Sequence, residues 1–395
     1  MFAFTAAMNF SFRRAVLLSA PFFLTLSPPA QANFAQVSVG GVSIAGLDAK
    51  SATRRLNREL GSKLDKRIAL AAGRRIAYRK RRDLGFTLNL GEMLARASKG
   101  QKRIPVSFNV NQKKASDALS RLAPTFSSAP VDARPVLSRG KVRLRRQVVG
   151  QKLDVSTSAA RLKIQAEKNA AQTRFSLVDK QLAPRLSANR LQGINAVIGT
   201  FSTRFNPGQV KRTRNMRVAV RAIDGTLLSP GEVFSLNKVV GERTQARGYR
   251  TAIIFQGGKK EAGIGGGVSQ VTGTLFNAAL LAALPIVSYR VHSRPVTYLP
   301  LGRDATVAWG SFDMKFKNDS PSPIFIDYKL QGSRLTATLF GKRTGKRGTL
   351  RVVSKKVGER AVEAKLFRTI RQNGKVVKKE TVGTSSYSWK EDNED

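Results

Sequence analysis

Cysteine is absent from the 395 residues of this chain, and histidine occurs once, as His292. Without cysteine, the fold cannot be held by disulfide bonds and must depend on its hydrophobic core. One histidine and no cysteine also exclude the usual ligand set of a structural zinc site. We therefore expect neither a metal nor a cofactor.

A long apolar run is also missing, apart from a short one near the N-terminus (residues 15–26). Arg13 and Arg14 precede this run, and the small-residue sequence Ala30–Gln31–Ala32 follows it. This order is typical of a secretory signal peptide. The run is too short for a membrane span of about 20 residues, so we expect a signal peptide over residues 1–32, cleaved after Ala32. An uncleaved anchor is the alternative. Export would place the protein in the periplasm or at the cell wall.

Acidic residues are scarce, with 25 Asp and Glu against 70 Lys and Arg, which gives a net charge of +45. Such a chain attracts polyanions. Nucleic acid would be the first candidate in the cytosol, but export argues against a specific nucleic-acid partner. Peptidoglycan or anionic cell-wall polymers remain as partners, with an anionic membrane surface as a peripheral contact. No pattern in the sequence indicates an oligomeric state.

Residues 37–185 contain an internal repeat. Two helical stretches (residues 50–56 and 113–119) are each followed by a hairpin pattern, a glycine, a short strand and a second helix. The glycines that precede the short strands, Gly85 and Gly150, set a period of about 65 residues. The pattern predicts two small, similar α+β units.

The rest of the chain predicts a second kind of structure. Residues 199–341 mix helical and strand patterns and end in strands with a turn near Gly332. Residues 349–389 predict further strands in a β-rich extension, with a tight turn at Asn373–Gly374, and residues 390–395 form an acidic tail. We therefore expect an α+β fold, in which the two repeated units precede a mixed α+β domain with C-terminal β-strands.

A glycine run that leads into a helix occupies residues 263–280. Glycines leave backbone amides exposed, and the start of a helix carries a positive dipole end. Ser269 therefore lies where a nucleophile or an anion is favoured. The residues that we assign to ligand binding here are Gly265, Gly266, Gly267 and Gln270.

Ordered motifs across residues 199–341 resemble the VanW family, which is named for an accessory protein of vancomycin-resistance clusters. The motifs are Phe201–Thr203, Asn215–Ala219, Leu228–Ser235, Val240–Thr244, Arg247–Tyr249, the glycine run, His292–Pro295 and Gly302–Val307. The resemblance implies a cell-envelope protein of unsettled biochemical activity. It also implies that the upstream repeats are the peptidoglycan-binding domain found there in related proteins; a spacer between the membrane and the C-terminal domain is the alternative.

The same resemblance bears on Ser269, because family members usually carry cysteine at this position. A cysteine at a helix start, then a histidine and then an aspartate is the chain order of papain-like and transglutaminase-like sites. Here the set would be Ser269 as nucleophile, His292 as base and Asp304 as the carboxylate that orients it. Serine is a much poorer nucleophile than a cysteine of lowered pKa, so Ser269 is alternatively a helix N-cap in a domain that only binds.

His292 has a structural alternative as well, since a lone histidine is often a satisfied core residue. Arg294 and Arg303 are candidates to clamp a carboxylate or phosphate, or else they form salt bridges, one of them with Asp304. The function that we expect is that of an exported VanW-like protein that binds peptidoglycan or anionic wall polymers. The alternative is an acyl-transfer enzyme, a hydrolase or transpeptidase, that acts on peptidoglycan peptides.

Overall fold

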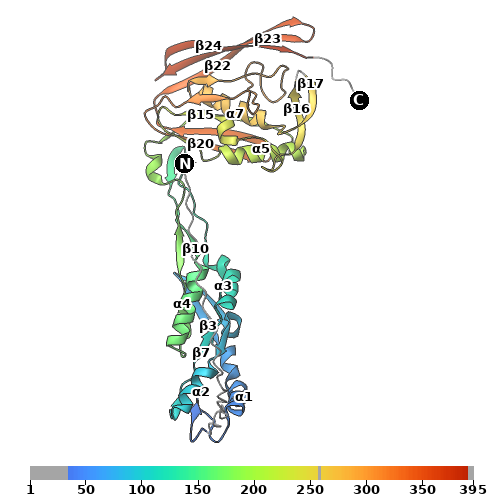
Figure 1. Cartoon of the computed structure of the whole chain (residues 1–395). Helices are drawn as coiled ribbons and strands as arrows, with labels where there is room; N and C mark the ends of the chain where they lie inside the picture. The colour runs from blue at the N-terminus through green and yellow to red at the C-terminus, as the bar shows by residue number, and fades with distance from the viewer. Residues whose placement is uncertain (1–33, 257–258, 390–395) are drawn as a thin grey trace, which may run out of the picture. The chain divides into compact units, whose positions relative to one another are not determined.

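The computed structural model describes residues 34–256 and 259–389. The predicted signal peptide (1–32) and acidic tail (390–395) lie outside the described residues. The described chain divides into two compact units, one of residues 34–127 and 153–180 and the other of residues 128–152 and 181–389. Both mix helices and strands (Figure 1), which confirms the predicted α+β class. Within the described residues, no helix is long and apolar enough to span a membrane.

The first unit is built from short elements around one core. Its helices and strands are β1 (Ser38–Val39), β2 (Val42–Ser43), α1 (Ala49–Leu60), η1 (Gly61–Asp65), β3 (Arg67–Ala72), β4 (Arg75–Lys80), η2 (Arg82–Leu84), β5 (Phe86–Leu88), α2 (Leu90–Ser98), β6 (Arg103–Ile104), β7 (Phe108–Val110), α3 (Gln112–Phe126), α4 (Val155–Lys168) and β11 (Arg174–Ser176). Two further strands, β10 (Gly150–Leu153) and β12 (Asp179–Leu182), have residues in both units.

Side-chain caps fix where the four helices of the first unit begin. Asp48, Asn89, Asn111 and Asp154 each accept a hydrogen bond from the backbone amide three residues later. A cap of this kind is worth about 1 kcal/mol, and all four residues stand just before a run with helical periodicity. The capping residues in the sequence therefore determine where the helices of this unit begin.

The repeat that the sequence predicts is present as an order of elements. Helix, hairpin, short strand and helix recur as α1, β3–β4, β5 and α2, and then as α3, β8–β9, β10 and α4. The helices of both sets pack into one core, which contains Leu56, Met93, Leu119 and Leu162, whereas no described residue of β8–β9 belongs to it. Within it, Phe86 meets both Phe108 and Phe175 edge to face, at 6.0 and 5.8 Å between ring centroids.

The hairpin β8–β9 groups with the second unit, so the compact units do not coincide with the predicted range 37–185. A small cluster of buried apolar residues explains this grouping, since Ala133, beside β8, packs with Phe325 and Phe340 of the second unit. Arg134 forms an ion pair with Asp224.

The second unit has one helix between two sheets. Its elements are β8 (Arg134–Ser138), β9 (Lys141–Arg145), η3 (Ala188–Leu191), β13 (Ala196–Arg204), α5 (Val210–Ile223), β14 (Leu227–Leu228), β15 (Val233–Ser235), α6 (Leu236–Val240), β16 (Thr251–Gln256), β17 (Lys259–Ile264), α7 (Val268–Leu281), β18 (Ile286–Ser288), β19 (Lys315–Lys317), β20 (Ile324–Gln331), β21 (Arg334–Gly341), β22 (Lys346–Gly358), β23 (Ala361–Gln372) and β24 (Lys375–Ser388). An antiparallel sheet in the order β13-β21-β20-β14 lies on one side of α7, and the sheet β22-β23-β24 lies on the other (Figure 1).

Helix α7 is buried along almost its whole length, and its buried polar side chains, Gln270, Thr272, Thr274 and Asn277, are all hydrogen-bonded. Close backbone approach makes this possible. A Cβ at Gly199 of β13 would lie 2.4 Å from the carbonyl oxygen of Ala278, and a Cβ at Gly348 of β22 would lie 2.2 Å from that of Leu280. Glycine on both sheets therefore allows their strands to pack closely against opposite sides of the helix.

The C-terminal strands complete the same core rather than forming an appendage. Leu366 of β23 is fully buried in the core that surrounds α7. The predicted turn is confirmed, because Asn373 and Gly374 both have positive φ, 51° and 87°, as in a type I′ hairpin. The C-terminal strands therefore belong to the unit that contains the glycine run.

Candidate functional site

The glycine run forms a turn between β17 and α7. Gly265 has φ of 92°, and Gly267 has φ of 102° and is the N-cap of α7. The capping interpretation of Ser269 is therefore wrong: the chain enters the helix two residues earlier, through a glycine conformation that a serine would strain. Ser269 lies in the first turn of the helix.

Buried Asn215 of α5 holds this turn in place. Its Nδ2 donates to the carbonyl oxygens of Arg250 and Gly266, at 2.8 and 3.0 Å, and its Oδ1 accepts from the amide of Arg250 at 2.7 Å. The side chain is fully buried. One amide therefore joins α5 to both ends of the β16–β17 hairpin.

His292 and Asp304 are brought together. Asp304 Oδ2 lies 2.7 Å from His292 Nδ1 and accepts the backbone amide of His292 at 2.8 Å. Tyr387 of β24 donates its hydroxyl to Asp304 Oδ1 at 2.5 Å and accepts the amide of Gly302 at 2.7 Å. His292 lies in a loop after β18 rather than on a strand, so this network sets the orientation of its ring.

The network also keeps Asp304 charged. Burial alone would raise the pKa of this carboxyl, but the hydrogen bonds from His292 and Tyr387 outweigh burial, and the pKa lies below its ordinary value. Burial and the nearby charge of Asp304 raise the pKa of the Tyr387 hydroxyl. The pair is thus a carboxylate and a neutral phenol at neutral pH.

Ser269 faces the same region from α7. Its Oγ lies 3.3 Å from Thr306 Oγ1, and Thr306 follows Asp304 by two residues. Ser269 is partly exposed, whereas the side chain of His292 is 5% exposed and that of Asp304 is 2% exposed. The loop that carries Asp304 therefore contacts both Ser269 and His292.

A cleft of about 1610 Å³ opens over these residues, and both Ser269 and His292 line it. Among the described residues, its charged lining consists of Arg204, Arg212, Arg243, Arg290, Arg294 and Glu242. Its apolar lining includes Ile253, Ile264, Tyr298, Val307, Trp309 and Phe312. The cleft therefore combines a strong excess of guanidinium groups with apolar walls.

The predicted ligand-binding residues divide into two groups. Gly265, Gly266, Gly267, Gln270 and Arg294 line the cleft. Arg303 faces elsewhere: its Nε donates to Asn277 Oδ1 of α7 at 2.8 Å, and its guanidinium lies 4.9 Å from the centre of the Phe201 ring. It ties the Asp304 loop to α7.

Gln270 has a structural task within the lining. Its Nε2 donates to Thr203 Oγ1 at 3.0 Å and to the carbonyl oxygen of Arg204 at 2.7 Å. Its Oε1 accepts Arg212 Nη2 at 2.7 Å. These bonds occupy the whole amide, so Gln270 positions Arg212.

Sequence reasoning assigned no site role to Arg204, Arg212, Arg243, Arg290 or Tyr387. Among 70 basic residues, single arginines are hard to distinguish, although Arg243 lies within the motif Val240–Thr244. Tyr387 lies more than 80 positions after Asp304, and no local pattern joins them. Arg212 could have been found from its spacing on α5. It stands three and four positions before Asn215 and Met216, and this spacing places it beside the buried face of the helix.

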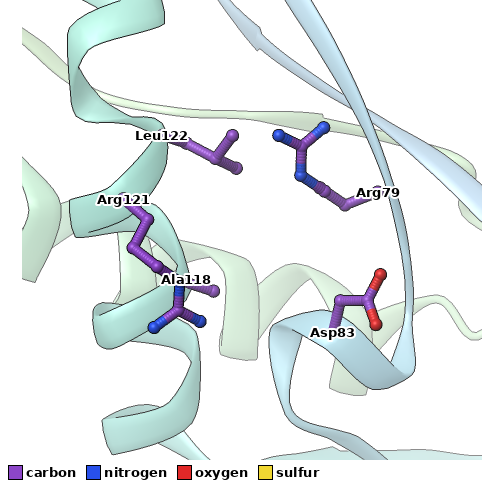
Figure 2. Close-up of a pocket in the computed structure, with 5 residues that line it drawn as sticks. All are labelled: Arg79, Asp83, Ala118, Arg121 and Leu122. Atoms are coloured by element: carbon purple, nitrogen blue, oxygen red, sulfur yellow. The ribbon is translucent and has the colours of Figure 1, made fainter.

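The first unit has a smaller pocket of about 400 Å³. Figure 2 shows Arg79 reaching from β4 towards α3, with Asp83 on the adjacent η2 and Ala118, Arg121 and Leu122 on α3. Its polar groups are two guanidiniums and one carboxylate.

Two family models match the chain. Residues 211–340 match a model described as "VanW like protein", and residues 64–174 match one described as "Putative peptidoglycan binding domain". The two matches follow in the order that the sequence predicts, and together they support a cell-envelope location with a wall polymer as partner.

Curated relatives agree with the first match. The chain is 41% identical over 166 residues to the uncharacterized protein YoaR of Bacillus subtilis, covering 42% of this chain and 52% of the relative. It is 26% identical over 140 residues to the vancomycin B-type resistance protein VanW of Enterococcus faecalis, covering 34% and 51%. The chain spans about half the length of each of these relatives.

No solved structure matches the chain. The family assignment therefore rests on the two models and the curated relatives. The chain carries a VanW-like domain, preceded by a domain of the kind that the peptidoglycan-binding model describes.

Proposed function

We propose that this is an exported envelope protein whose cleft at the start of α7 binds an anionic group of peptidoglycan or of an anionic wall polymer. The observation that carries the proposal is the lining of the cleft, which contains five arginines and one glutamate, Glu242, among the residues that the structure describes. Guanidinium groups recognise carboxylates and phosphates through paired, charge-assisted hydrogen bonds. Apolar walls beside a few fixed polar groups are typical of ligand sites.

The first unit supplies a second contact in this proposal. Its match to a peptidoglycan-binding model and the two arginines of its pocket, Arg79 and Arg121, support a role in attachment to the wall. Two weak contacts on one chain raise the retention of the whole protein. A spacer role is the alternative. Peptidoglycan binding by the double variant Arg79→Gln, Arg121→Gln distinguishes the two roles, since weaker binding supports attachment and unchanged binding supports a spacer.

Export is part of the proposal. The motive is the charged, apolar and small-residue order that ends at Ala32. Mass spectrometry of the mature protein should show an N-terminus at Asn33. A cytosolic species that begins at Met1, or at Met8 as an alternative translation start, would overturn this part.

Sedimentation with purified peptidoglycan tests the cleft. Arg204 and Arg290 are exposed and line it, so Arg204→Glu with Arg290→Glu reverses two charges there. The matched control is Arg217→Glu with Arg221→Glu, two exposed positions on α5 that do not line the cleft. We expect a much larger loss of pelleting from the cleft variant. Equal losses would show that net charge alone binds the wall.

A second candidate function is acyl transfer on peptidoglycan peptides. One observation favours it: Ser269 and His292 line the same cleft, and Asp304 holds the Nδ1 side of the imidazole. In this function, Ser269 Oγ attacks the peptide carbonyl while His292 takes the hydroxyl proton. The C–N bond then breaks, the proton passes to the leaving amine, and water or a second amine takes the acyl group from Ser269.

The substitution Ser269→Cys tests this alternative. If the site can activate a nucleophile, the introduced thiol, the sole one in the chain, should alkylate at least about tenfold faster than a free thiol near neutral pH, and His292→Ala should remove that advantage. The measurement is the rate of modification by mass spectrometry. A thiol that reacts at the free rate with or without His292 would contradict the enzymatic function.

A further inference from the structure

Two arginines of the cleft lining, Arg212 and Arg243, flank the glycine run. A Cβ at Gly267 would lie 2.9 Å from Arg212 Cγ, and a Cβ at Gly265 would lie 3.1 Å from Arg243 Cγ. Arg212 comes from α5, and Arg243 follows α6. The glycines therefore leave space in which both side chains pass directly against the backbone.

Each arginine is held by a neutral amide oxygen instead of a carboxylate. Arg212 Nη2 donates to Gln270 Oε1 at 2.7 Å, and Arg243 Nη1 donates to Asn237 Oδ1 at 2.6 Å. Both amides are themselves fixed, Gln270 by Thr203 and Arg204 and Asn237 by the carbonyl oxygens of Ala308 and Phe312 at 3.1 and 2.8 Å. A neutral side-chain amide fixes the position of a guanidinium without cancelling its positive charge.

Within the described residues, neither guanidinium of this pair has a carboxylate in direct contact. No carboxylate forms an ion pair with either guanidinium; Asp313 attracts Arg243 from a distance but bonds Ser235 and the amide of Asn237. Arg243 Nη2 is buried and has no hydrogen-bond partner among the described residues. Burial lowers the pKa of both guanidiniums, which marks the cost of their desolvation.

Backbone donors lie between the two side chains. In the described part of the chain, the amides of Gly266, Gly267 and Ser269 donate to no backbone or side-chain acceptor. They stand at the positive end of the 14-residue helix α7. Fixed guanidiniums, free amides and a helix start together form a set of donors for one oxyanion.

Resting on the proposed function, we infer that Arg212 and Arg243 form the specificity pocket of the cleft and bind a terminal oxyanion, a carboxylate or a phosphate, whose attached apolar part lies along the cleft wall. Tyr298, over whose ring Arg212 lies at 5.8 Å, and the exposed side chains of Ile253 and Ile264 form that wall. Glu242, the one carboxylate of the lining among the described residues, is exposed and disfavours a second negative charge on the ligand.

Titration calorimetry with three probes tests the inference on the full mature chain. The probes are a peptidoglycan stem peptide with a free C-terminal carboxylate, the same peptide as its C-terminal amide, and a short glycerol phosphate oligomer. We expect one of the two anionic probes to bind, which identifies the source of the oxyanion, and the amide to bind at least about tenfold more weakly than the carboxylate if the peptide is the ligand.

Variants then locate the binding. Arg212→Gln and Arg243→Gln should each weaken the bound probe by about tenfold to a hundredfold. Arg212→Lys, which keeps the charge and loses the forked geometry, should give an intermediate loss. Arg217→Gln, on the exposed face of the same helix, is the matched control and should leave the affinity unchanged. Thermal unfolding of each variant checks that the fold is kept.

The outcomes separate this inference from the proposed function. If Arg212→Gln and Arg243→Gln bind the probe as the unaltered protein does, while the Arg204→Glu, Arg290→Glu variant loses pelleting, the cleft binds the wall but the pocket is wrong. If neither the probes nor whole peptidoglycan bind the unaltered protein, both are overturned.

Discussion

At Asp304, a single carboxylate accepts hydrogen bonds from three donors, namely the ring and the backbone amide of His292 and the hydroxyl of Tyr387. These donors come from the loop after β18 and from the last strand. The residue thus joins two segments that are more than 80 positions apart in the chain. Asp304 therefore fixes the orientation of the His292 imidazole that lines the cleft.

The substitution Asp304→Asn should destabilise the protein by about 2 kcal/mol near neutral pH, since charged hydrogen bonds are worth about 1.5–3 kcal/mol. The folded pKa of Asp304 lies below its unfolded value, so its contribution is present above about pH 4 and is lost as pH falls through the folded pKa. Thermal unfolding as a function of pH measures this. Asp117→Asn, at an exposed ion pair on α3, is the control. A Tm difference that does not narrow in acid would contradict the assignment.

At the scale of elements, α7 organises the second unit, because both sheets pack on it and its start forms the cleft. The approach of β22 depends on Gly348, where a Cβ would lie 2.2 Å from the carbonyl oxygen of Leu280. The β22–β24 sheet carries Tyr387 to Asp304. A shift of this sheet would therefore open the network as well as the core.

The substitution Gly348→Ala should lower the free energy of unfolding by about 1–3 kcal/mol, the usual range for overpacking. It should also raise the hydrogen-exchange rate of the Gly302 amide, which donates to the Tyr387 hydroxyl. Gly358→Ala, on the same strand, meets only an ordinary contact at 3.4 Å and should change stability by less than about 0.5 kcal/mol. Chemical denaturation and amide exchange measure the two effects. If both variants unfold alike, β22 does not pack on α7 as described.

The sequence predicted elements more reliably than their packing. The Asn373–Gly374 turn and the glycine run before α7 follow from local conformational preferences, and both were found. Local preference does not reveal that Arg303 turns to Asn277, or that a tyrosine near the end of the chain reaches Asp304. Such contacts depend on three-dimensional closure. The N-cap of α7 was misassigned because serine and glycine both suit that position, and only the positive φ selects glycine.

At the scale of the whole molecule, a net charge of +45 acts on any anionic surface. This attraction is long-ranged and carries no geometric information, unlike the fixed arginines of the cleft. Non-specific retention and specific recognition are therefore distinct properties of the chain, and they differ in their response to salt.

Retention on whole cell walls should fall as salt rises from 0.1 to 1 M, because the screening length shortens from about 10 to about 3 Å. Walls stripped of phosphate polymers should also retain less protein. The remaining, salt-resistant fraction should depend on Arg212 and Arg243. Sedimentation across a salt series measures this, and retention that is unaffected by either treatment would contradict a role for the overall charge.

The most direct test of the cleft uses His292, the sole histidine, as a built-in probe. In untagged ¹⁵N-labelled protein, all imidazole signals come from the ring that lines the cleft. Titration with a soluble disaccharide-peptide fragment of peptidoglycan with a free terminal carboxylate should shift these signals progressively to saturation, with the Kd given by calorimetry. A fragment that binds with the same Kd while the imidazole signals stay unmoved would contradict binding in the cleft.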